Sequence, residues 1–271
     1  MKNISLFTII SLFIISLMSG CNAEEGLNGY PDEENKENEE SGRVLLPSKI
    51  ITYSSTLFSP SRISFVALEY DSQNRIICIE YVYNGEKYKT VKVSYENDDI
   101  NTEELLQSDP EYKVVKVYRR DGMQVLINGK EDIGIDNNLQ AVHVEQDMYG
   151  PCNFTYDDNG NAISYTYHAW SDERTRTVNF TYNNDNGIFR NVKVPSWFLT
   201  TQLYNFVVSE ENKITYQSLY NNCATSSENG YDLYKYEYTY SEDYPIKINE
   251  IPVGVVSNSS MSFEVEYIDA N

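Results

Sequence analysis

Alternation of apolar and polar residues constrains this chain more than any other feature, because it recurs along most of the length. In the stretch 90–95, Val91 and Val93 fall on one face of an extended chain, and Lys92 falls on the other. The stretch 261–267 repeats the pattern. Side chains of a β-strand point alternately to its two faces, so this period predicts half-buried strands rather than helices.

Six Asn-Gly or Asp-Gly pairs separate these alternating stretches. Such pairs supply the positive φ angles that type I′ hairpin turns require. Hairpins at this density predict an all-β fold: an antiparallel meander of about a dozen strands that forms a large sheet or a partly closed barrel. The pairs are Asn84-Gly85, Asp121-Gly122, Asn128-Gly129, Asn159-Gly160, Asn186-Gly187 and Asn229-Gly230.

One segment departs from the alternation and predicts a short helix. In 194–206, Ser196 stands where a capping residue would, and apolar residues follow at near-helical spacing. We expect this helix to seal an end or an edge of the sheet. A further turn of helix is expected within 101–108.

A loose internal repeat runs through the hairpins. Residues 154–163 are echoed by 180–188 and, more weakly, by 68–76. Each copy has a strand that ends in Tyr, then a polar turn, then an aliphatic start to the next strand. The spacing is too irregular for a solenoid of fixed period. Residues 44–271 are therefore expected to form a single all-β domain.

The first twenty residues have the features of a secretory signal peptide. Lys2 supplies the positive charge, 4–18 is an apolar run, and Ser19 and Gly20 are small residues before Cys21. The apolar run is shorter than the roughly 18–20 residues that a membrane-spanning helix needs. The segment before Cys21 resembles the lipobox of bacterial lipoproteins, which implies a diacylated Cys21 that anchors the chain to a membrane. The alternative is an ordinary signal peptide with a Cys at the cleavage point.

Residues 21–43 comprise Cys21 and an acidic stretch that we expect to be a disordered tether. It has dense negative charge and almost no apolar residues, so it cannot bury enough surface to fold. The pair Glu24-Glu25 resembles the surface-export signal of Bacteroidetes lipoproteins. This implies an outer-membrane lipoprotein exposed on the cell surface; the alternative is a plain acidic linker that faces the periplasm.

The formal net charge of −20 limits the possible partners. A strongly acidic chain repels phosphate backbones, so we expect no nucleic-acid partner. The partners that we still expect are the membrane, which the chain would contact through Cys21, and a glycan or protein ligand.

Three cysteines follow Cys21. Cys78 lies in an apolar run and is interpreted as a buried small hydrophobe. Cys152 and Cys223 flank turn-like segments; they could form a disulfide, or both could be free. The cysteine spacing offers no zinc motif.

The sequence offers no recognisable catalytic or metal-binding group. The two histidines, His143 and His168, lie on expected strands without metal-type partners. Adjacent acids such as Glu103-Glu104 point to opposite faces of a strand and cannot form a catalytic pair. Residues 157–161 have the spacing of a calcium loop but lack its Gly and its bidentate Glu. We therefore predict a non-enzyme with no metal and no cofactor.

Aromatic residues are the remaining signal, with 24 Tyr in the chain. Four of them share one face of the stretch 234–240. Such a row could stack against a sugar or peptide, or it could simply stabilise neighbouring strands.

Taken with the Pro-x-Trp-Phe-Leu segment at 195–199, this organisation resembles a family of Bacteroidetes lipoproteins of unknown function with a porin-like β-meander fold. The resemblance implies fold and location and supplies no functional residues. Our hypothesis is a non-catalytic surface binding or scaffold protein of the cell envelope. The alternatives are a carbohydrate-active hydrolase with carboxylates assembled from distant strands, and a purely structural envelope protein.

The lipid anchor can be tested directly. Replacing Cys21 with Ala removes the acylation site, so the variant should leave the membrane fraction and take up no labelled palmitate. Membrane association of the variant equal to that of the parent, without palmitate in either, would contradict the anchor.

Overall fold

The computed structural model describes residues 43–56, 59–145, 151–168, 174–200, 219–253 and 259–270. The expected signal peptide, Cys21 and nearly all of the tether lie outside the described residues. Within the part described, no helix is long and apolar enough to cross a membrane.

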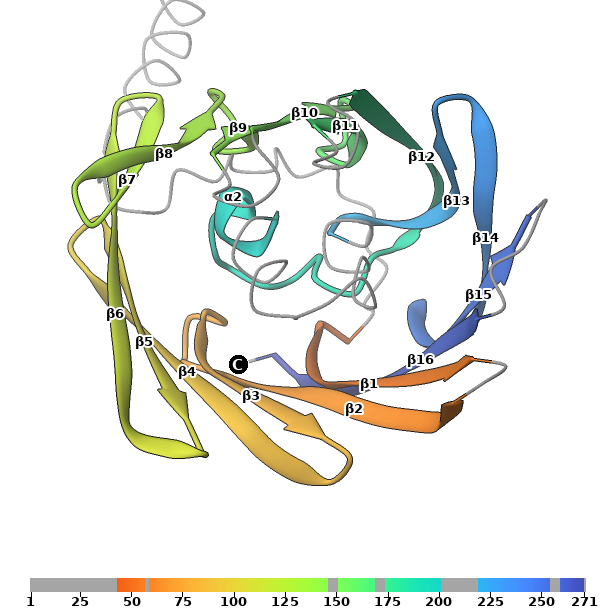
Figure 1. Cartoon of the computed structure of the whole chain (residues 1–271), viewed down its shortest axis with the longest axis horizontal. Helices are drawn as coiled ribbons and strands as arrows, with labels where there is room; N and C mark the ends of the chain where they lie inside the picture. The colour runs from red at the N-terminus through yellow and green to blue at the C-terminus, as the bar shows by residue number, and fades with distance from the viewer. Residues whose placement is uncertain are drawn as a thin grey trace, which may run out of the picture.

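Sixteen antiparallel strands form a closed barrel in the described residues, with each strand beside its neighbours in sequence and β1 paired with β16 (Figure 1). The all-β meander is thus confirmed, but the sheet closes completely and has more strands than expected. The short strands β7 to β10 carry too few residues for a clear alternation. The strands are β1 (Leu45–Thr56), β2 (Ser59–Tyr70), β3 (Ile76–Tyr83), β4 (Glu86–Glu96), β5 (Asp99–Leu106), β6 (Asp109–Asp121), β7 (Gln124–Ile127), β8 (Lys130–Ile135), β9 (Ala141–Val144), β10 (Cys152–Tyr156), β11 (Ala162–His168), β12 (Thr175–Asn186), β13 (Asn221–Glu228), β14 (Tyr231–Ser241), β15 (Tyr244–Pro252) and β16 (Ser259–Asp269).

The period-two alternation separates the inner and outer faces of the barrel wall. Ile79 pairs with Val91 across β3 and β4, and both side chains are completely buried on the inner face. The adjacent pair, Cys78 and Lys92, lies on the outer face. Successive side chains of a strand point to opposite faces, so a register shift of one residue would exchange the inner and outer side chains of that strand.

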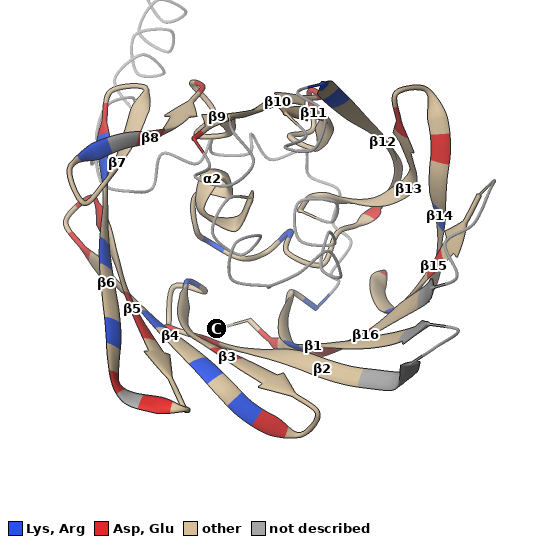
Figure 2. Ribbon diagram, viewed as in Figure 1, with Lys and Arg blue, Asp and Glu red and all other residues tan. Residues whose placement is uncertain are grey.

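Charged residues occur along many of the strands (Figure 2). Arg119 on β6 forms an ion pair with Asp99 on β5 at 2.6 Å, and Lys49 on β1 pairs with Glu266 on β16 at 3.2 Å. A lipid-facing barrel wall needs a continuous apolar band. These ion pairs interrupt such a band at β5–β6 and at β1–β16.

Two-residue type I′ turns connect three of the hairpins, as the Asn-Gly pairs predicted. Both central residues have positive φ: 50° and 84° at Asn84-Gly85, with nearly equal values in the other two. The other three pairs do not form this turn: Asp121-Gly122 and Asn159-Gly160 have positive φ at the glycine alone, and Asn186-Gly187 ends β12 without forming a hairpin. Gly187 donates its N–H to the carbonyl of Tyr220, and the chain turns into the barrel.

Three five-residue connections, 71–75, 136–140 and 157–161, share one geometry, and we call them the Asp loops. In each, Oδ1 of the leading Asp accepts the N–H groups of the third and fifth residues at 2.8–3.0 Å. The fourth residue of each loop has a positive φ. These residues are Asn74 (61°), Leu139 (58°) and Gly160 (87°).

The Asp loops correct the sequence repeat. The copies at 68–76 and 154–163 are equivalent, as expected, whereas 180–188 forms no such loop. The copy at 136–140 was not predicted from the sequence, because Ile135 stands in place of the preceding Tyr and Leu139 in place of the Gly or Asn of the other loops. The repeat therefore depends on an Asp side chain that satisfies the backbone of its own turn.

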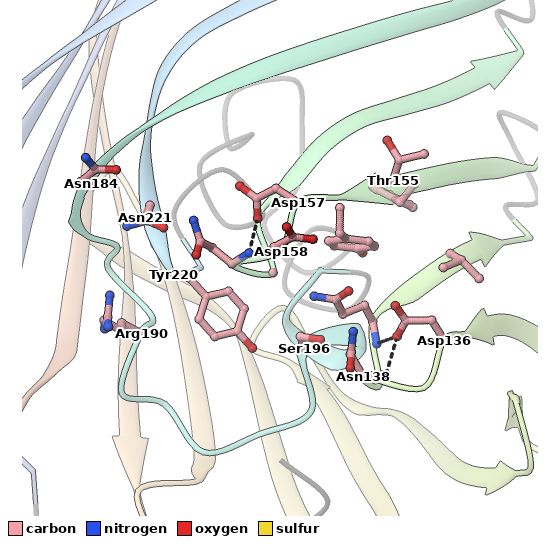
Figure 3. Close-up of a pocket in the computed structure, with 16 residues that line it drawn as sticks. Asp136, Asn138, Thr155, Asp157, Asp158, Asn184, Arg190, Ser196, Tyr220 and Asn221 are labelled. Atoms are coloured by element: carbon pink, nitrogen blue, oxygen red, sulfur yellow. Dashed lines mark hydrogen bonds between the residues drawn. The ribbon is translucent and has the colours of Figure 1, made fainter. Parts of the chain in front are cut away.

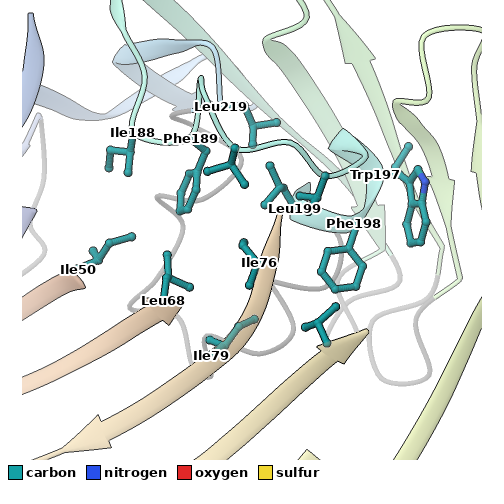
Figure 4. Close-up of a cluster of buried hydrophobic side chains, with 14 of the residues drawn as sticks. Ile50, Leu68, Ile76, Ile79, Ile188, Phe189, Trp197, Phe198, Leu199 and Leu219 are labelled. Carbon is teal, nitrogen blue, oxygen red and sulfur yellow. The ribbon is translucent and has the colours of Figure 1, made fainter. Parts of the chain in front are cut away.

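The chain after β12 enters the barrel lumen, where residues 187–200 and 219–220 form what we call the inner segment (Figure 1). A barrel of about eight strands can be filled by its own side chains, whereas sixteen strands leave a wide lumen. Apolar side chains of the inner segment fill part of this space against the wall (Figure 4). They are Ile188, Phe189, Trp197, Phe198, Leu199 and Leu219, none more than 4% exposed.

Each Asp loop holds the inner segment through its fourth residue. The carbonyl of Asn74 accepts the N–H of Lys193 at 3.0 Å. The carbonyl of Leu139 accepts the N–H of Trp197 at 3.2 Å and the hydroxyl of Ser196 at 2.9 Å. The third loop packs Gly160 against the ring of Tyr220.

The short helix differs from the expectation in its cap. It is α2 (Ser196–Phe198), preceded by Pro195 with no side-chain cap. Ser196 instead donates its hydroxyl to the carbonyl of Leu139. The helix lies inside the ring of strands, beside the 136–140 loop, and so at an end of the sheet as expected (Figure 1). The expected continuation to 206 falls outside the described residues. The helical turn expected within 101–108 is wrong, because that stretch belongs to β5 and the turn that follows it.

Six tyrosines form a second repeated device. Each lies on an even-numbered strand and donates its hydroxyl, at 2.6–2.9 Å, to a backbone carbonyl near the start of the preceding strand. Burial raises the pKa of all of these phenols for which a shift is resolved, so they remain donors. Much of the tyrosine signal is therefore structural. The six are Tyr70, Tyr95, Tyr156, Tyr182, Tyr238 and Tyr267.

All three described cysteines are free. Cys152 and Cys223 are buried, so the open question of a disulfide between them is answered in favour of thiols. Cys78 is only half-buried and faces outward, so its interpretation as a buried hydrophobe is wrong. Burial raises the pKa of Cys152 to about 11.

A thiol reagent should therefore distinguish the two faces of the wall. In the folded chain lacking residues 1–21, maleimide should modify Cys78 first and reach Cys152 and Cys223 only in denaturant. Peptide mass spectrometry gives the order, and Cys78→Ser is the control that should remain unmodified when folded. Modification of Cys152 in the folded chain at the rate of Cys78 would contradict this placement.

Candidate functional site

A hollow of about 910 Å³ lies at the barrel end where the Asp loops are found, and we call it the mouth hollow. The Asp loops 136–140 and 157–161 contribute to it, together with the end of β12 and parts of the inner segment (Figure 3). These segments are brought together only by the closed barrel. The residues that line it are Asp136, Asn138, Gln140, Val142, Phe154, Thr155, Tyr156, Asp157, Asp158, Asn159, Gly160, Asn184, Arg190, Ser196, Tyr220 and Asn221.

A buried network of amides supports one side of the mouth hollow. Asn161 donates its side-chain N–H to Oδ1 of Asn221 at 3.0 Å, and the backbone N–H of Asn221 returns a bond of 3.0 Å to Asn161. Asn161 also binds Oδ2 of Asp157 at 3.0 Å. Asn161 and Asn221 are 1% and 8% exposed, so this network is rigid rather than solvated.

Two of the three carboxylates in the mouth hollow are used by the fold itself. Asp136 and Asp157 accept two backbone N–H groups each within their own Asp loops. The other carboxylate oxygen of Asp157, Oδ2, accepts the side-chain N–H of Asn161. Asp158 is exposed and makes no side-chain hydrogen bond with the described residues, so it is the carboxylate that remains available.

Several neutral and positive groups also face the mouth hollow without serving the fold. Asn138, Asn184 and Arg190 are exposed. Figure 3 shows Asn184 and Arg190 on one side, Asn138 on the opposite side and Asp158 between them. The site therefore offers hydrogen-bond donors and acceptors around its rim.

Aromatic rings supply the apolar part of the lining. Phe154 on β10 packs against Tyr165, with ring centroids 5.8 Å apart. Tyr220 lies across the centre of the view in Figure 3. A Cβ added to Gly160 would come within 2.8 Å of its ring and within 3.0 Å of the amide of Gln140. Tyr220 is thus held in place by an Asp loop.

Residues singled out from the sequence lie elsewhere. His143 is on the outer face of β9, with Nδ1 2.8 Å from Asn153 and Nε2 3.2 Å from Glu145. The hydrogen bond with Asn153 raises the pKa of His143. His168, at the end of β11, is exposed on the outer face. Neither histidine reaches the mouth hollow.

The acidic residues also follow the strand geometry. Glu103 faces outward and forms an ion pair with Lys113, whereas Glu104 faces the lumen. Within the described ranges no cluster of His, Cys, Asp and Glu has the arrangement of a metal site. The calcium-like spacing at 157–161 instead serves the hydrogen bonds of the Asp loop.

The sequence pattern at 157–161 predicted no site, and the mouth hollow was not predicted. One feature of the sequence does point to this end of the barrel: a turn that begins with Asp occurs three times along the chain. It identifies the loops at one barrel end, but not the side chains that meet there.

Comparison with known proteins gives structural likenesses only. No family model matches the sequence, and no curated protein matches it. Among solved structures, the chain is similar to a porin-like protein from Bacteroides uniformis ATCC 8492, with a TM-score of 0.42 and 14% identity over 82% of this chain and 96% of that one. It is also similar to a porin-like protein from Bacteroides vulgatus ATCC 8482, with a TM-score of 0.39 and 12% identity over 83% and 99%. At these values neither structure bears on function.

The contact between Gly160 and Tyr220 can be measured with a matched pair of variants. Gly160→Ala and Gly85→Ala both place a side chain at positive φ, 87° and 84°, but a Cβ at Gly85 has nothing within 4 Å. Both should lose about 1–2 kcal/mol of unfolding free energy from backbone strain. Gly160→Ala should lose about 1–3 kcal/mol more from overpacking.

Urea unfolding curves supply both values. Adding Tyr220→Ala should relieve the extra loss at Gly160 and leave the loss at Gly85 unchanged. Equal losses for the two glycine variants would show that the contact is not made.

Proposed function

We propose that this chain is a non-catalytic, lipid-anchored binding protein of the cell envelope, and that the mouth hollow holds its ligand. One observation carries the proposal: the mouth hollow presents polar side chains that the fold does not use, on a rigid support that the fold builds. Binding sites gain affinity when the contacting groups are already positioned.

Binding is favoured over hydrolysis by the state of the carboxylates. Glycoside hydrolysis needs two carboxyl groups that face each other across the scissile bond. Asp136 and Asp157 each accept two backbone N–H groups of their own loops, so their Oδ1 atoms are already engaged within the fold. Asp158 alone does not make a catalytic pair.

Location at the envelope follows from the leader and tether. A diacylated Cys21 anchors the chain stably, since two acyl chains suffice without a spanning segment. The acidic stretch that follows would hold the barrel away from the bilayer. We place the barrel on the outer surface of the outer membrane, on the basis of Glu24-Glu25.

A thermal-shift experiment tests binding and its place together. The candidate ligands to be added are cellohexaose, maltohexaose, hexagalacturonate and hexa-alanine. A probe that binds only the folded chain raises Tm, by about 2–4 °C for each kcal/mol of stabilisation. At least one probe should do so with the parent but not with Asp158→Ala/Asn184→Ala.

The control is Asn179→Ala/Glu237→Ala, which removes the same kinds of side chain from exposed positions on the outer wall. It should respond like the parent. No shift with any probe, or an equal shift in the Asp158→Ala/Asn184→Ala variant, would refute binding at the mouth hollow. Cleavage of a probe, detected by mass spectrometry, would refute the non-catalytic role and favour a hydrolase.

A further inference from the structure

The chemistry of the mouth hollow specifies a class of ligand, and we infer that it binds a neutral oligosaccharide. This inference rests on the proposed function and deepens it. Four features of the site support it: the kind of polar groups, the fixed ring, the balance of charge, and the size.

The polar groups match hydroxyls. A sugar hydroxyl both donates and accepts hydrogen bonds, so its site must supply donors and acceptors together. The exposed amides of Asn138 and Asn184 each supply both, Asp158 accepts, and Arg190 donates. Adjacent hydroxyls on one ring can engage the two atoms of an amide or carboxylate at once.

The ring of Tyr220 provides a surface for the C–H face of a sugar. A phenol ring is flat and apolar on its faces and polar only at its tip. Its contact with Gly160 restricts how it can turn, because the loop backbone lies against the ring carbons. A fixed ring costs less conformational entropy on binding than a free one.

Charge argues against acidic ligands. Asp136, Asp157 and Asp158 all line the mouth hollow, and Arg190 is the cation in that lining. The chain as a whole carries a formal charge of −20. Uronic acids and phosphates would meet repulsion from both, whereas a neutral sugar would not.

Size argues for an oligomer. Ligand pockets usually measure roughly 300–1,000 Å³, and a volume of about 910 Å³ is near the upper end. A single monosaccharide would leave most of the space to water. Several linked sugar units would contact the polar groups on both sides and the ring between them.

Isothermal titration of the chain from residue 22 onward with cellohexaose, maltohexaose and N-acetylchitohexaose tests the inference. At least one should bind, and Asp158→Ala and Tyr220→Ala should each weaken it by about tenfold or more. Tyr220→Phe keeps the ring and should bind within about threefold of the parent, which separates stacking from a general loss of structure. The outer-wall variant Glu237→Ala should bind like the parent.

Hexagalacturonate and hexa-alanine separate failure of the inference from failure of the proposed function. If either binds, Tyr220→Ala weakens that binding and the neutral sugars do not bind, then the ligand class is wrong while binding at the mouth hollow stands. If a neutral sugar binds but the variants have no effect, the site is wrong. If none of the probes binds, the inference and the proposed function both fall.

Discussion

The structure depends on filling the lumen of its own barrel. A closed wall of sixteen strands encloses more space than its inward side chains can fill, and an unfilled apolar interior would forfeit the contacts that stabilise it. The chain answers this with the inner segment, whose apolar side chains pack on the wall. Phe198 is completely buried and meets the ring of Tyr118 edge-on at 5.8 Å. Wall and filling therefore stabilise each other.

The Asp loops connect these two parts. Each loop is stable locally, since an Asp side chain satisfies two backbone N–H groups that the turn would otherwise leave unpaired. Each then uses its fourth residue to contact the inner segment. The positive φ at that residue orients the contact, which is why Leu139 accepts a conformation that disfavours its side chain. The tyrosine hydroxyls brace the same end of the wall.

The mouth hollow is a consequence of this construction. Loops that are held rigidly at one barrel end leave a space between them and the inner segment. The carboxylates of Asp136 and Asp157 accept hydrogen bonds that stabilise their own loops. The side chains of Asp158, Asn184 and Arg190 line the hollow and are exposed. The proposal of a binding role rests on this arrangement of one available carboxylate among amides and rings. That division between structural and available groups underlies the proposed function.

The sequence by itself determined the strands and the tight turns, because alternation and positive φ at Asn-Gly depend only on residues a few positions apart. It also predicted which acids lie on opposite faces, such as Glu103 and Glu104. Closure was decided by the tertiary structure, since β1 and β16 pair across more than 200 residues. So was the lumen position of α2: an apolar segment shows that it will be buried, not what will cover it. The mouth hollow belongs to the same class, because its residues meet only after the barrel has closed around the inner segment.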